Sequence, residues 1–135
     1  MTSQLSQIKW VRVVLTAIVV YVLSFVTIFI VVTAYATVLG FQARGAPDQN
    51  LITAFADQYA PWIGSISLIL FTFLASILMA RRLDTAVQPN GIALGVFASI
   101  LNLTVGGARG FDAGVLITML LTIAAGWLGA RLANK

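Results

Sequence analysis

Cysteine, histidine and glutamate are all missing from this chain of 135 residues. Without cysteine there is no disulfide, no thiolate nucleophile and no cysteine-ligated metal centre. Without histidine the chain lacks the commonest general base and metal ligand, and the usual axial ligand of haem. The acidic side chains are four aspartates, Asp48, Asp57, Asp84 and Asp112. We therefore expect no enzymatic activity, no cofactor and no metal site.

Charge is also scarce, because only 9% of the residues are charged while 60% are hydrophobic. A soluble domain is typically about 25% charged and about 45–50% apolar. A chain of this length has too little interior to bury so much apolar surface, which predicts an integral membrane protein. The net charge of +4 does not indicate nucleic-acid binding, because the basic residues are spread over segment ends and form no single stripe.

Four apolar stretches are predicted to be transmembrane helices, at 12–39, 61–80, 91–108 and 113–131. The first would be about 40 Å long, against a hydrocarbon core of about 30 Å, so it has room to tilt or to project. It also carries a basic start and an Ala34-Tyr35-Ala36 sequence typical of a signal-peptide cleavage site. Its apolar run is too long for a signal peptide, so we expect an uncleaved anchor. The predicted fold is all-α, a four-helix transmembrane bundle forming one domain over 1–135.

The connection at 41–60 is the one long polar segment between the predicted spans. Leu51, Phe55, Tyr59 and Trp62 recur at helical spacing, which predicts a short amphipathic helix lying at the outer membrane interface. The alternative is a loop helix packed on the ends of the bundle. Pro61 suits the first turn of the following span, where its missing N–H costs nothing. Gln88-Pro89-Asn90-Gly91 is predicted to be a turn before the third span.

Basic residues are divided unequally between the two sides of the predicted membrane. The larger set comprises Lys9, Arg12, Arg81, Arg82, Arg131 and Lys135, and the smaller set Arg44 and Arg109. The positive-inside rule then places both termini in the cytoplasm, and we expect a bacterial inner (plasma) membrane. The tryptophans agree as interfacial anchors, with Trp10 and Trp127 inside and Trp62 outside.

A short sequence echo links the two predicted hairpins. Ala43-Arg44-Gly45 precedes Asp48 in the first outer loop, and Ala108-Arg109-Gly110 precedes Asp112 in the second. One interpretation is a duplicated hairpin, and the other is chance, since matches this short arise often. The Arg and Asp of each loop are candidates for an outer ion pair, but helix capping and exposed pairing of little energetic value are the simpler interpretation.

Small residues recur every four positions along the predicted third and fourth spans. The candidate helix-packing positions are Gly91, Gly95, Ser99, Gly114, Thr118, Thr122 and Gly126. Small residues let helix backbones approach closely, either within this chain or against another chain, and packing within the chain is favoured for most of them. Asn102 is the one amide well inside a span, and it needs a hydrogen-bond partner on a neighbouring helix.

No ionisable residue lies deep in a predicted span, which argues against a proton-coupled carrier. The leading hypothesis is a non-enzymatic accessory or structural subunit that packs against other integral membrane proteins. One alternative is a homo-oligomeric transporter or channel component, whose path would be lined by the hydroxyl groups of the spans and by Asn102. A second alternative is a lipid-binding protein that uses the stretch at 49–60. Lipids, anionic ones included, are further candidate partners, because the inner surface is basic.

Overall fold

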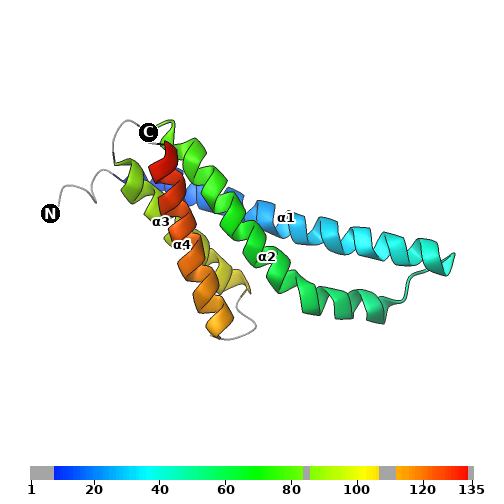
Figure 1. The fold of residues 1–135 in the computed structure, drawn as a ribbon. Coiled ribbons are helices and arrows are strands. Elements are labelled where there is room, and N and C mark those ends of the chain that lie inside the picture. Colours follow the sequence, from blue (N-terminus) through cyan, green and yellow to red (C-terminus); the bar gives the residue numbers. More distant parts are fainter. Residues whose placement is uncertain (1–7, 84–85, 107–111, 134–135) are drawn as a thin grey trace.

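The computed structural model describes residues 8–83, 86–106 and 112–133, and this part of the chain is all-helical. Its helices are α1 (Trp10–Ala43), α2 (Gln49–Ala80), α3 (Val87–Gly106) and α4 (Ala113–Ala133). The helices run alternately up and down, so α1 begins near the end of the molecule where α4 finishes (Figure 1). The predicted all-α class is confirmed.

Three of the helices, α1, α2 and α4, are long and apolar enough to cross a membrane. α3 has 20 residues and is not among them. Gln88, Asn90 and Asn102 make it less apolar than its neighbours. The predicted first, second and fourth spans therefore correspond to helices suited to a bilayer, while a crossing by α3 stays a prediction.

α1 and α2 are longer than α3 and α4, and this difference divides the molecule into two regions. With 34 residues, α1 is about 51 Å long, whereas the 20 residues of α3 reach about 30 Å. We call the part where all the helices pack together the four-helix region: residues 10–24, 67–80, α3 and α4. Beyond it, residues 25–66 form a two-helix extension, which contacts α4 at its base through Ser65 and then projects away from α3 and α4 (Figure 1).

The four-helix region holds every buried side chain of α1 and α2. On α1 these are Val13, Ala17, Val20 and Ser24, whose spacing of three or four residues forms one stripe along the helix. α1 packs on α2 and α3 with this stripe, and α4 packs on α2 and α3. No side chain in the extension, residues 25–66, is buried.

The predicted separate interfacial helix at 49–60 is wrong, because α2 is one helix from Gln49 through Pro61 to Ala80. Asp48 caps the start of α2 well before the predicted span at 61–80, since its carboxylate accepts a hydrogen bond from the Asn50 N–H at 2.9 Å. The ring of Phe55 stacks on Tyr35 of α1 with centroids 4.0 Å apart, so the apolar face of this segment packs on a helix. Pro61 removes one helical hydrogen bond, which long membrane helices tolerate.

α3 also begins earlier than expected, at Val87 rather than Gly91. Ala86, just before it, has a left-handed backbone with φ 53°. Pro89 lies in the first turn of α3, where a missing N–H is harmless. The sequence around Pro89 was interpreted as a turn, but it is the helix start itself, and it places Asn90 inside the protein.

Candidate functional site

The closest approach between helices lies where α3 crosses α4. A Cβ atom on Gly91 would lie 2.5 Å from both the Gly126 carbonyl oxygen and the Ala130 Cβ. A Cβ on Gly126 would in turn overlap the Gly91 carbonyl oxygen, and one on Gly95 would lie 2.7 Å from the Ile123 Cα. Any side chain here would push two backbones apart, so these three predicted packing glycines hold α3 against α4.

α2 reaches the same crossing from the other side of α4. The Ser76 hydroxyl donates a hydrogen bond to the Gly126 carbonyl oxygen at 2.5 Å. A Cβ on Gly129 would lie 2.5 Å from the Phe73 carbonyl oxygen. Gly129 was not among the predicted packing residues, although it lies among other small residues in the sequence. Three helices therefore meet at backbone distance around Gly126.

Hydroxyl groups line the remaining contact between α2 and α4. The Thr118 hydroxyl donates to the Gly114 carbonyl of its own helix at 2.9 Å, and its oxygen lies 3.3 Å from the Ser65 hydroxyl across the contact. Thr122 and Ser99 are also buried, and each donates to the carbonyl four residues earlier on its own helix. Thr72 Oγ1 is buried with no hydrogen-bond partner in the described part of the chain. Hydroxyl groups used in this way are typical of helix packing.

Two of the predicted packing residues lie away from this crossing. Gly114 is exposed, and a Cβ added to it would meet only the Asp112 carboxylate, at 3.2 Å. Asn102 is half-buried near the far end of α3 from Asn90. The small-residue period on α4 therefore marks a packed face only from Thr118 onward.

Asn90 is a structural residue that sequence reasoning missed. Its side chain is fully buried, and its Oδ1 accepts a hydrogen bond from the Lys9 backbone N–H at 3.0 Å. Its Nδ2 donates to the Ala86 carbonyl at 2.8 Å. One side chain thus joins the start of α1 to the start of α3. Its position in the sequence could have indicated this role, because Asn90 directly precedes Gly91, Gly95 and Ser99, the small residues that recur every four positions.

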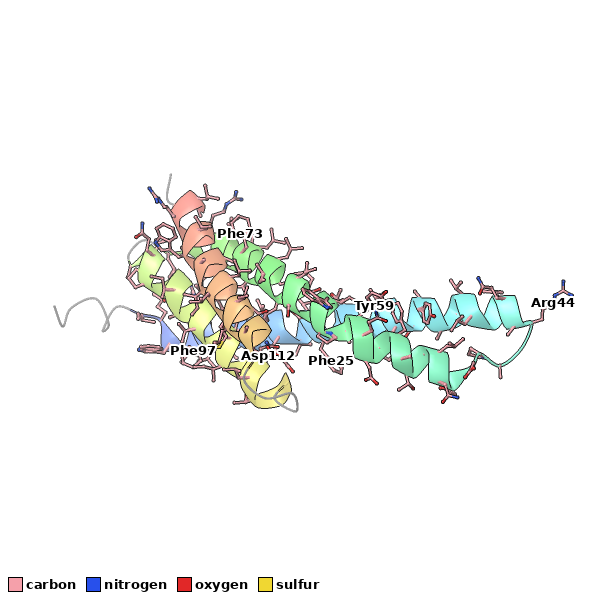
Figure 2. All side chains as sticks on the ribbon, turned by 60° about the horizontal axis from the view of Figure 1, so that its bottom comes forward. Phe25, Arg44, Tyr59, Phe73, Phe97 and Asp112 are labelled. Atoms are coloured by element: carbon pink, nitrogen blue, oxygen red, sulfur yellow. The ribbon has the colours of Figure 1, made fainter. Side chains whose placement is uncertain are left out.

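The outer aspartates act as helix caps. Asp48 caps α2, and Asp112 caps α4 by accepting from the Val115 N–H at 2.8 Å. Arg44 ends α1 in a left-handed conformation at the far tip of the extension, as Figure 2 shows. The other predicted outer arginine, Arg109, lies outside the described residues. Each hairpin therefore has a capping aspartate at the start of its second helix, which is the simpler of the two interpretations above.

The predicted inner anchors lie at the end of the molecule where α1 begins and α4 ends. Trp10 packs edge-on against Phe97 of α3 with ring centroids 6.0 Å apart. The Arg131 guanidinium lies over the Trp127 ring, 5.3 Å from its centroid. Arg81 and Lys9 are exposed. Trp62, the predicted outer anchor, is 71% exposed on the extension.

A groove between α1 and α2 is the second feature that sequence reasoning missed. It has a volume of about 540 Å³ and opens beside Arg12 and Arg82. The Arg12 Nη1 donates to the Arg82 carbonyl oxygen at 3.3 Å, which links the two helix ends. The groove forms only where two helices pack together, so no pattern within one stretch of sequence predicts it.

Chemically, these arrangements provide close helix packing and an apolar groove bordered by two arginines. The described residues hold no cluster of acidic side chains able to ligate a metal ion. The molecule is an all-helical protein with three helices suited to crossing a membrane. Comparisons with protein families, with curated proteins and with solved structures find no match to this chain.

Proposed function

We propose that this protein is a non-enzymatic accessory or structural subunit, a four-helix transmembrane bundle that packs against other integral membrane proteins. Both termini face the cytoplasm of a bacterial inner membrane, because six of the eight basic residues belong to that side. With the four-helix region in the bilayer, α3 provides the fourth crossing, and the extension points away from the cytoplasm.

The observation that carries this proposal is the apolar, unpacked surface of the two-helix extension. Its exposed side chains are Phe25, Val26, Phe29, Ile30, Val38, Phe41, Leu51, Tyr59, Trp62 and Ile66. α1 is about 20 Å longer than the hydrocarbon core is thick, so part of this surface lies beyond the lipid tails. There it would face headgroups or water, and covering it gains about 25 cal/mol per Å² of apolar area. The helices of another membrane protein provide such a cover.

The small-residue faces also support the extension, rather than the four-helix region, as the surface for a partner. Gly91, Gly95, Gly126 and Gly129 are in contact with backbone atoms of neighbouring helices of this chain. These faces are therefore occupied by the protein's own helices, and the extension remains as the surface for a partner. This partner surface consists of large aromatic and aliphatic side chains rather than glycines, as is usual at the anchor positions of protein interfaces.

Extraction from the native membrane in mild detergent, followed by native mass spectrometry, tests the proposal. We expect other membrane proteins to co-purify at fixed stoichiometry. The variant F29A/F41A should lose them, while L120A/L121A, which removes exposed apolar side chains of α4, should retain them. Recovery of the wild-type chain alone, or only with copies of itself, would overturn the proposal. Equal losses in both variants would also contradict a role specific to the extension.

A further inference from the structure

The groove between α1 and α2 has the shape of a binding site for a long, narrow apolar molecule. Its floor includes Val20 and Met79, which are buried, and Ala75, which is half-buried. Exposed aliphatic side chains, among them Leu23 and Leu74, form its walls. Thr16 is the one uncharged polar residue in the lining, and its hydroxyl already donates to the Arg12 carbonyl of its own helix.

The length of the groove matches one leaflet of a bilayer. On α1 it runs from Arg12 to Leu23, and on the other side from Phe71 of α2 to Arg82, two residues beyond the end of that helix. Each stretch corresponds to about 16 Å of helix, close to half of a hydrocarbon core of about 30 Å. An acyl chain from a single leaflet would therefore fill the groove from end to end.

Positive charge lies at one end of the groove only. Arg12 and Arg82 stand there together, at the level where Lys9 and Trp10 mark the membrane interface. The hydrogen bond from Arg12 to the Arg82 carbonyl uses one of five N–H donors of that guanidinium, so the others can serve an anion. A second, shallow and open groove, lined by residues at the start of α1 alone, begins at the same place and shares Arg12 and Thr16 with the first.

We propose that this site binds an anionic phospholipid of the inner leaflet. One acyl chain lies in the groove between α1 and α2, and the phosphate is held by the guanidinium groups of Arg12 and Arg82. The adjoining groove beside Trp10 and Leu15 receives the second chain. Two arginines suit a phosphate because the planar guanidinium can donate two parallel hydrogen bonds to its oxygens. This inference does not depend on the partner proposed above.

Native mass spectrometry of the purified, delipidated protein tests the headgroup. The probes are dioleoylphosphatidylglycerol and dioleoylphosphatidylcholine, which carry the same chains and differ in net charge. We expect the anionic lipid to bind about 25-fold more tightly, since each basic residue near the surface contributes roughly fivefold. R12Q/R82Q should abolish most of this preference. R81Q/R131Q, with the same loss of charge at the same end but outside the groove, should retain it.

A second variant tests the chain-binding part of the site. L74W places a large ring in the groove wall and should weaken binding of both lipids, whereas L70W, one turn away and outside the lining, should not. Glycerol phosphate, a headgroup without chains, should compete poorly. Equal binding of the two lipids, equal losses in the two double variants, or full competition by glycerol phosphate would overturn the proposal. L74W remains informative even where R12Q/R82Q fails to fold.

Discussion

α1 and α2 run through both the four-helix region and the two-helix extension, but the helices are held together differently in the two regions. In the four-helix region many of the contacts between helices involve backbone atoms, as between Gly91 and Gly126, beside packed side chains such as Trp10 against Phe97. In the extension they are made by side chains, with the stacked rings of Tyr35 and Phe55 as the clearest pair. A helix in lipid satisfies its own hydrogen bonds, so α1 and α2 can continue past the point where their packing ends.

This difference shows where sequence changes are tolerated. A backbone contact has no freedom to adjust, because neither partner can rotate away. A side-chain contact can adapt through rotamer changes. We therefore expect large effects from small substitutions in the four-helix region, and small or local effects from larger substitutions in the extension.

Adding one methyl group in each region should give the largest contrast. In G126A the new Cβ overlaps the Gly91 backbone oxygen, so α3 and α4 must separate, and we expect a loss of about 3 kcal/mol. In G64A the new Cβ meets the flexible tip of Ile28 at 3.0 Å, so we expect a change near zero. Unfolding of both variants by titration with SDS measures the difference. Equal destabilisation would remove the distinction between the two regions.

Removing an asparagine side chain should give the next largest contrast. N90A removes a fully buried amide and, with it, the acceptor of the partly buried Lys9 backbone N–H, which should cost about 2 kcal/mol. N50A removes an exposed amide at the start of α2, and its stability should not change measurably. Melting temperatures in one detergent compare the two. A stable N90A would mean that the starts of α1 and α3 are held together by other contacts.

Deleting a hydroxyl group should give a smaller effect. S76A loses the hydrogen bond from α2 to the Gly126 carbonyl, and we expect a loss of about 1 kcal/mol. T37A, in the extension, loses only a bond to the Thr33 carbonyl of its own helix and should stay within a few tenths of wild type. The same SDS titration reads both variants. A larger effect in T37A than in S76A would reverse the expected order.

Breaking the aromatic stack should have an effect confined to one region. F55A removes the ring between Tyr35 and Tyr59, whose pairings contribute about 1 kcal/mol beyond area burial. Hydrogen exchange should quicken at 49–60 and stay unchanged in α3 and α4. L51A, an exposed neighbour, should alter neither segment. Faster exchange throughout the protein would mean that the two regions unfold as a single unit.

The sequence allowed much of the fold to be predicted, because hydrophobic runs and charged borders act locally. Composition and spacing predict the all-α class and the start of α4. They also predict that Gly91 and Gly126 lie at close helix contacts. The continuity of α2 does not, since Pro61 and the polar segment before it indicate a break. The ring of Tyr35, 20 positions before Phe55 and on the neighbouring helix, packs against that segment.

The candidate site was less predictable, for a related reason. Arg12 and Arg82 were recognised as basic residues of the inner side, but their proximity depends on how α1 crosses α2. Asn90 was interpreted as part of a turn, because its partner Lys9 lies at the other end of the sequence. Properties of one helix can be predicted from periodicity, whereas properties shared by two helices require the fold.

Pro61 gives the two helices of the extension different mechanical properties. α1 is an uninterrupted helix, whereas α2 contains this proline and is not straight in Figure 1. Proline leaves the helix without one hydrogen bond and makes that position the easiest place to bend. In the extension, α1 is therefore a stiff helix and α2 is a helix that can bend at Pro61. A force applied at Arg44 would therefore bend α2 at Pro61, while α1 would move as one straight helix and transmit the movement to its first residues.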